Sequence, residues 1–195
     1  MKHFLDISDF TLKQINSIIK TAKQIKKSPK KFANKCKGKT LGMIFEKDST
    51  RTRASFTVGF QKLGGHVLEL RSNDIGFGKR ESYEDVLKTL SQFIDCLMIR
   101  NNNHKILKRL SYLNALPIIN GLSDYSHPCQ ILSDFLTINE KIGGLKNKQI
   151  SWIGDYNNVL RSLIELQHIY NFKLHIVIPK EVLKKNKSEI INLAN

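Results

Sequence analysis

Hydroxyl and guanidinium side chains are concentrated in one short segment, FEKDSTRTRASF, at residues 45–56. An apolar run ends where this segment begins, and a helix-like pattern starts within it at about residue 52. The first N–H groups of a helix are unpaired and its dipole is positive there, so a phosphate is stabilised before any side chain contributes. Arg51 and Arg53 would oppose that dipole if no anion joined them. The segment therefore predicts a phosphate site rather than an ordinary capped helix.

Two further segments carry groups that could bind the same anion. The apolar run DCLMIR ends in Arg100, and NGLSDYSHPCQ brings His127 and Gln130 to a helix start, with Pro128 in the first turn. Taken singly, a strand-end arginine is often solvated, and a helix-start histidine is more often a cap or surface residue. We infer a site because three successive loops would deliver anion-binding or carbonyl-binding groups to one sheet edge.

A fourth loop, WIGDYNNVLRS, places Gly154 and Asp155 after an apolar run. Asn157 and Asn158 follow at the start of the next helix-like segment. Asn158 is either a helix cap or a ligand-binding residue, and its spacing alone favours neither interpretation.

Short apolar runs alternate with amphipathic segments, which is typical of a parallel α/β sheet with helical crossovers. We expect the first helix to carry its apolar face from Phe10 to Ile25, with Asp9 or Ser8 as its cap. Further helices are expected at 52–63, 82–94, 104–113, 128–141, 158–170 and 181–193. Strands are expected at 41–45, 67–70, 96–99, 116–119, 150–153 and 174–178.

The predicted fold class is α/β, with a four-stranded parallel sheet flanked by helices and followed by the start of a second α/β domain. Gly143, Gly144 and the polar residues 146–148 mark the boundary, which gives domains at 1–142 and 149–195. The second unit shows two strands, too few for a parallel sheet that needs cover on both faces. We therefore expect this second domain to be incomplete.

Composition narrows the class of protein. The chain is 41% hydrophobic and 25% charged, as in ordinary soluble proteins, and no apolar run approaches the roughly 20 residues of a membrane span. The N-terminus carries acids where a signal peptide would be apolar, so we expect a cytoplasmic protein without membrane contact. The three cysteines form no CxxC pair, which argues against a disulfide framework and a zinc site.

The net charge of +15 favours anionic partners without naming them. Its lysines are scattered over surface-like positions, and no aromatic residues interleave with them to stack bases. We interpret them as a solvated face and expect no nucleic acid partner. Salt-dependent DNA binding would favour the opposite interpretation.

The segments FEKDSTRTR, HPCQ and GDYNN, together with the strand-ending Arg100, resemble the aspartate and ornithine carbamoyltransferases in order and spacing. The resemblance runs from about residue 4 to the end of the chain. Lys47, Cys129 and Asn158 are more similar to the ornithine branch than to the aspartate branch. An acceptor amine such as putrescine remains an alternative.

The resemblance implies transfer of a carbamoyl group from carbamoyl phosphate to L-ornithine, giving L-citrulline and phosphate, as in arginine biosynthesis or related metabolism. It implies that Asn158 binds the amino-acid end of ornithine, and that 1–142 and 149–195 are the carbamoyl-phosphate domain and the beginning of the ornithine domain. Neither a metal nor an organic cofactor is implied. The residues that it assigns to carbamoyl phosphate are Ser49, Thr50, Arg51, Thr52, Arg100, His127 and Gln130.

Three of these residues, Arg51, Arg100 and His127, would act in catalysis. The neutral δ-amine of ornithine would attack the carbonyl carbon, and these side chains would stabilise the resulting oxyanion and the departing phosphate.

The segment from Ser72 to Val86 resembles the loop that, in this family, reaches into a neighbouring subunit's site. Lys79 would then touch carbamoyl phosphate across the interface of a homotrimer or a multiple of trimers. A solvated loop lysine is the competing interpretation.

Family members continue beyond the length of this chain with residues for the second substrate, including a Cys-Leu-Pro motif that residues 1–195 lack. The chain resembles the N-terminal two-thirds of an ornithine carbamoyltransferase, so we expect a truncated enzyme. Alone it would bind carbamoyl phosphate weakly and turn over little or nothing. The alternative is a non-catalytic phosphate-binding remnant of the same fold.

Overall fold

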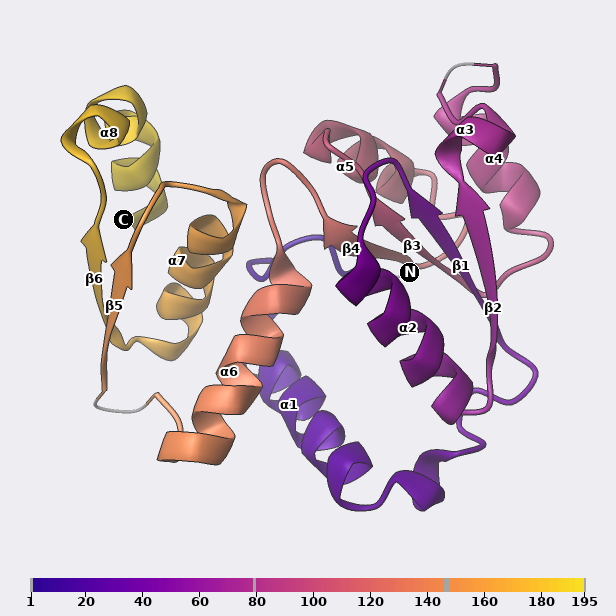
Figure 1. Cartoon of the computed structure of the whole chain (residues 1–195), viewed down its shortest axis with the longest axis horizontal. Coiled ribbons are helices and arrows are strands. Elements are labelled where there is room, and N and C mark those ends of the chain that lie inside the picture. Colours follow the sequence, from indigo (N-terminus) through magenta and orange to yellow (C-terminus); the bar gives the residue numbers. More distant parts are fainter. Residues whose placement is uncertain (1, 79, 146–147, 195) are drawn as a thin grey trace.

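The computed structural model describes residues 2–78, 80–145 and 148–194, and Figure 1 shows their arrangement. Four parallel strands form the main sheet in the order β2 (His66–Arg71), β1 (Thr40–Phe45), β3 (Cys96–Arg100) and β4 (Ile118–Leu122). Phe45, the last residue of β1, pairs with Arg71 on one side and with Arg100 on the other. The predicted α/β class with a four-stranded parallel sheet is confirmed, and the loops that follow the strands meet at one edge.

Helices cover both faces of this sheet (Figure 1). On one face, Val86 and Leu87 of α4 (Tyr83–Leu90) and Leu107 and Leu110 of α5 (His104–Tyr112) bury their side chains against Ile99 and its neighbours. On the other face lies α2 (Thr50–Lys62), whose residues all remain at least partly exposed. The carboxyl edge of the sheet is therefore held by a well-buried core on one side.

The first helix, α1 (Leu12–Lys27), begins later than its apolar pattern indicates. Thr11 caps it by accepting the Gln14 N–H, and the Gln14 side chain returns to the Thr11 N–H, which forms a capping box. The expectation that Asp9 or Ser8 caps this helix is wrong. The Asp9 carboxylate instead accepts the backbone N–H of Asp6 and pairs with Lys108.

Other element limits differ from the predictions by a few residues. Strand β4 begins at Ile118, two residues after the expected start, and α4 ends at Leu90 rather than near residue 94. Two short helices, η1 (Pro29–Phe32) and α3 (Ser72–Ile75), lie in segments that we took as loops. Each is a single turn, too short for hydrophobic periodicity to indicate it.

The rest of the chain forms a second unit beside α6 (Pro128–Ile142) (Figure 1). Strands β5 (Gln149–Ile153) and β6 (Lys173–Val177) pair in parallel, and α7 (Asn158–Tyr170) and α8 (Lys180–Ala194) accompany them. The domain limits 1–142 and 149–195 stay a prediction.

A common apolar cluster connects the two units. It contains Ile15 and Ile19 from α1, Phe135 from α6, Leu166 from α7 and Phe172 before β6. Helix α7 is therefore packed against α6 and positioned relative to the main sheet. Within the described residues, we find no helix long and apolar enough to cross a membrane.

Replacing Ile99, which is fully buried in β3, should reveal how strongly the sheet core contributes to stability. We expect Ile99→Ala to lower the free energy of unfolding by about 2 to 5 kcal/mol, because it removes apolar burial and leaves a cavity. Ile153→Ala is the matched control, since that strand residue is 80% exposed, and it should change stability by less than about 0.5 kcal/mol. Urea unfolding followed by circular dichroism measures both, and equal losses would contradict the prediction.

Candidate functional site

A hollow of about 790 Å³ opens beyond the carboxyl ends of β1, β3 and β4. It lies between the first turns of α2 and α6, where loops in parallel sheets form ligand sites. The structure thus brings the three predicted loops to one place. The predicted residues that line the hollow are Ser49, Thr50, Arg51, Thr52, Arg100, His127 and Gln130.

The N-terminus of α2 and the end of β3 are joined by hydrogen bonds. Ser49 caps α2 by accepting the Thr52 N–H at 3.2 Å. Arg100 Nη1 donates to Ser49 Oγ and Thr52 Oγ1, both at 3.2 Å. Burial and, next, the nearby Arg51 lower the pKa of Arg100. Two guanidinium groups and a helix N-terminus therefore face one hollow, which favours a ligand with more than one negative charge.

Arg53 does not share this role. Its Nε lies 2.8 Å from Glu69 Oε1 of β2, and its guanidinium lies over the Phe45 ring, 4.8 Å from the centroid. Positions 51 and 53 are about 200° apart around a helix, so their side chains leave α2 in opposite directions. Our expectation that an anion offsets both arginines is wrong for Arg53, because Glu69 pairs with it.

His127 is the cap residue of α6 and lines the opposite wall of the hollow. Burial and, to a lesser extent, the positive charge of Arg100 lower the pKa of His127 to about 4. The imidazole is therefore neutral at physiological pH and offers one donor and one acceptor. Its Nδ1 is buried and has no hydrogen-bond partner among the described residues.

Two neighbours of His127 on α6 also face the hollow. Gln130 Nε2 donates to Asp134 Oδ1 at 2.9 Å, which orients the amide. Cys129 Sγ donates to the Asn120 carbonyl at 3.4 Å, and burial raises the pKa of this thiol to about 12. Cys129 therefore stays protonated and is not a nucleophile.

Asn158 lies at the first position of α7 and is not its cap. Asn157 caps the helix, accepting the N–H groups of Val159 and Leu160 at 3.0 and 3.1 Å. The alternative in which Asn158 is the cap is therefore wrong. Asn158 Nδ2 donates to the Ser123 carbonyl at 2.6 Å, and Val159 beside it lines the hollow. Lys79, the remaining candidate, falls outside the described residues.

Family models match both units. Residues 2–140 match the carbamoyl-P binding domain of aspartate/ornithine carbamoyltransferase, and residues 146–195 match the Asp/Orn binding domain. The chain belongs to the aspartate/ornithine carbamoyltransferase family. The resemblance inferred from FEKDSTRTR, HPCQ and GDYNN is confirmed.

Individual relatives give the same assignment. An ornithine carbamoyltransferase of Rhizobium meliloti is 43% identical over 91% of this chain and 59% of its own length. The structure of ornithine carbamoyltransferase from Pyrococcus furiosus is 37% identical with a TM-score of 0.93, and the match covers 100% of this chain and 62% of that one. An anabolic ornithine carbamoyltransferase from Campylobacter jejuni is 38% identical, with a TM-score of 0.89 over 100% of this chain and 63% of that one. The chain thus spans about 60% of the length of these relatives.

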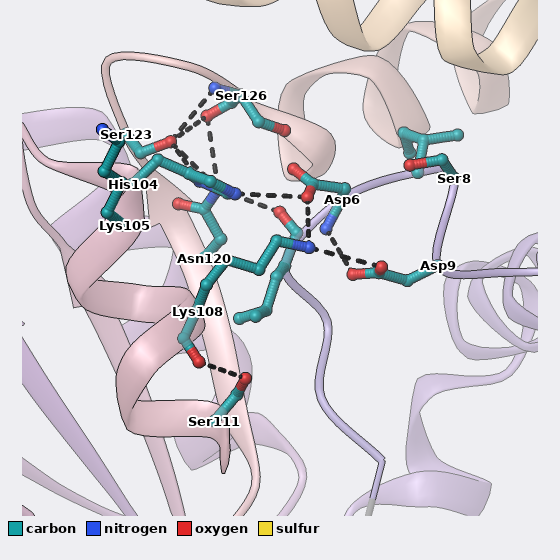
Figure 2. Close-up of polar contacts among 12 residues, drawn as sticks. Asp6, Ser8, Asp9, His104, Lys105, Lys108, Ser111, Asn120, Ser123 and Ser126 are labelled. Carbon is teal, nitrogen blue, oxygen red and sulfur yellow. Dashed lines mark hydrogen bonds and ion pairs between the residues drawn. The ribbon is translucent and has the colours of Figure 1, made fainter.

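A buried polar network that the sequence analysis missed supports the loop before His127 (Figure 2). Asp6 Oδ2 pairs with Lys108 Nζ at 2.7 Å and with His104 Nε2 at 3.2 Å. The other nitrogen of His104, Nδ1, lies 2.9 Å from Ser123 Oγ. The N-terminal segment and α5 are therefore tied to the first residue of the β4–α6 loop.

Asn120 extends this network from β4 (Figure 2). Its Nδ2 donates to the carbonyl oxygens of Leu5 and Ser126 at 3.0 and 3.3 Å. A polar side chain inside the apolar run IINGL was the available sequence signal, because a fully buried amide needs hydrogen-bond partners.

Glu165 of α7 is a second buried group with a displaced pKa. Its Oε2 accepts the backbone N–H groups of Ile7 and Ser8 at 3.0 and 3.2 Å. Burial and, next, the negative charge of Asp6 raise the pKa of Glu165 to about 7. The carboxyl group is therefore partly protonated near neutral pH.

His127 and Glu165 should impose opposite pH dependences on the stability of the folded chain. The folded pKa of His127 lies below its unfolded value, so its contribution decreases as pH falls from about 6.5 to 4. The folded pKa of Glu165 lies above its unfolded value, so its contribution is complete below about 4.5 and is lost as pH rises through 7.

The two variants His127→Asn and Glu165→Gln separate these effects. Between pH 4.5 and 6.5, we expect the slope of unfolding free energy against pH to become more negative in His127→Asn and more positive in Glu165→Gln. The change has an upper limit of about 1.4 kcal/mol per pH unit for each group. Urea unfolding across that range measures both slopes, and a shift of the same sign in both variants would contradict the assignment.

Proposed function

We propose that the hollow between α2 and α6 binds carbamoyl phosphate and that the protein transfers its carbamoyl group to L-ornithine, releasing L-citrulline and phosphate. The observation that carries this proposal is the convergence of Arg51, Arg100 and the α2 N-terminus with a neutral His127 on one hollow. The two arginines and the helix N-terminus suit a phosphate dianion, and the neutral His127 suits an uncharged carbonyl.

The phosphate would lie at the α2 N-terminus. Backbone N–H groups of the first turn, the hydroxyls of Ser49, Thr50 and Thr52, and the Arg51 guanidinium surround that end of the hollow. Arg100 already uses Nη1 on the two flanking hydroxyl oxygens, which holds its plane in place. Its remaining N–H groups could then reach both the phosphate and the bridging region of the substrate.

The carbamoyl group would lie toward α6. A neutral His127 can donate one N–H to the carbonyl oxygen, and Arg100 can donate a second hydrogen bond from the facing wall. Because Asp134 already accepts from the Gln130 amide nitrogen, the amide oxygen of Gln130 is oriented as an acceptor for the carbamoyl NH2.

Catalysis would follow from the placement of these charges. When the neutral δ-amine of ornithine attacks the carbonyl carbon, negative charge develops on the carbonyl oxygen and then on the departing phosphate. Arg100 and His127 would stabilise the oxyanion, and Arg51 would stabilise the phosphate. One well-placed donor of this kind contributes about 3 to 4 kcal/mol in other enzymes.

The choice of ornithine rests on the relatives, which are ornithine carbamoyltransferases. Asn158 is our proposed contact to its amino-acid end, and it directly precedes Val159, which lines the hollow. Because Asn158 Nδ2 donates to the Ser123 carbonyl, Asn158 Oδ1 is left to accept a hydrogen bond from an ammonium group.

Putrescine lacks that amino-acid end, so Asn158→Ala should impair use of ornithine more than use of putrescine.

We further propose a homotrimer or a multiple of trimers, in which Lys79 contributes to a neighbouring subunit's site. We also propose a role in arginine biosynthesis or related amino-acid metabolism and a cytoplasmic location.

Arg51→Ala should weaken ligand binding by about tenfold to a hundredfold, because a charge-assisted hydrogen bond to an anion contributes roughly 1.5 to 3 kcal/mol. We would titrate phosphonoacetamide, a stable compound in which a methylene replaces the bridging oxygen of carbamoyl phosphate, by isothermal calorimetry.

Arg53→Ala is the matched control, since it removes the same charge from the same helix turn but from the side that faces Glu69. It should bind within about threefold of the parent chain once its fold is verified by circular dichroism. Equal losses in the two variants would show that net charge, not the hollow, determines binding.

A further inference from the structure

We propose that Ser162, on α7 of the second unit, is a positioning residue for His127. We call residues 123–127, which join β4 to α6, the His127 turn. The inference rests on the proposed function in that His127 is taken to contact the carbamoyl group. It adds that a hydroxyl from the other unit determines where the imidazole stands.

The hydroxyl of Ser162 is fully buried and contacts the His127 turn at two atoms. It accepts the backbone N–H of His127 at 3.0 Å and lies 3.1 Å from Ser126 Oγ. His127 precedes the first full turn of α6, so its N–H has no partner within that helix. The bond to Ser162 satisfies this donor and fixes the backbone from which the imidazole projects.

A second contact from α7 holds the other end of the turn. Asn158 Nδ2 donates to the Ser123 carbonyl at 2.6 Å. Positions 158 and 162 are four residues apart, so they share one face of α7 and reach the turn together. On the opposite side, Asn120 and His104 bind the same turn from the main sheet and α5. The His127 turn is therefore held between the two units.

Packing alone does not require a hydroxyl at position 162. The buried face of α7 also carries Leu160, Ile164 and Leu166, and an alanine would occupy the space of the Ser162 methylene. Ser162→Ala thus removes the hydroxyl that contacts the His127 N–H and Ser126 Oγ, and it leaves the apolar packing of α7 in place. This variant isolates the contact to the turn from the burial of the helix.

Because the contact crosses from one unit to the other, a displacement of α7 would move the His127 backbone. The affinity of the hollow for the carbamoyl end of the ligand then depends on the second unit. This dependence is the consequence that an experiment can measure.

A double-mutant cycle tests the inference. We expect Ser162→Ala to weaken phosphonoacetamide binding about tenfold, because it leaves a buried N–H unpaired and releases the turn. In a His127→Ala background, Ser162→Ala should have no further effect, since the group that it positions is gone. Ser111→Ala is the control, because that hydroxyl donates to the Lys108 carbonyl within its own helix and Ser111 does not line the hollow.

The ligand-free protein provides an independent measurement. Histidine-labelled NMR should show the pKa of His127 rising from about 4 toward 6.5 in Ser162→Ala, since a released imidazole gains water and moves from Arg100. The signal of His127 is identified by its loss in His127→Ala. Ser111→Ala should leave this pKa unchanged.

Two results would overturn the inference. Ser162→Ala could weaken binding equally with and without the His127 imidazole, which would mean that it acts through the fold in general. It could also leave the pKa of His127 at its original value. If the parent chain failed to bind phosphonoacetamide at all, the proposed function would fail, while the NMR titration would still decide whether Ser162 positions His127.

Discussion

The guanidinium of Arg100 is held against the positive end of α2, and this unfavourable pairing of like charges determines the character of the site. Hydrogen bonds to Ser49 and Thr52 keep the guanidinium in this position. Its partial burial lowers the pKa of Arg100. Burial and, to a lesser extent, this same positive charge lower the pKa of His127 and keep its imidazole neutral. A dianion relieves the repulsion at one end of the hollow, and the other end remains suited to an uncharged group. The two ends of the hollow therefore suit ligand groups of different charge.

The sequence could predict the sheet and the residues on its loops because both depend on local patterns. Apolar runs of four or five residues indicate strands, and parallel strands bring their carboxyl ends to one edge whatever lies between them. Arg51, Arg100 and His127 each follow or end such a run, so their convergence did not require knowledge of tertiary contacts. The side chains at that edge could therefore be named before their distances were known.

Contacts between distant segments could not be predicted in the same way. Whether Arg53 of α2 is available to bind an anion depends on Glu69, which lies on strand β2. Which of Asn157 and Asn158 caps α7 depends on the exact residue at which the helix begins, and hydrophobic periodicity does not locate a helix start to one residue. The network around Asp6 and His104 joins residues 98 positions apart, and each residue alone resembles an ordinary surface polar group. These contacts support the site, yet the sequence signal for them is a single polar residue, Asn120, within an apolar run.

The apolar cluster shared by α1, α6 and α7 also has a consequence for biosynthesis. Ile15 is made early, but its partners Leu166 and Phe172 follow about 150 positions later. While the ribosome is still adding the intervening strands, the apolar face of α1 has no complete site in which to pack. The nascent chain therefore carries an incompletely covered amphipathic helix until Phe172 has been added, and such transiently exposed apolar surface favours aggregation.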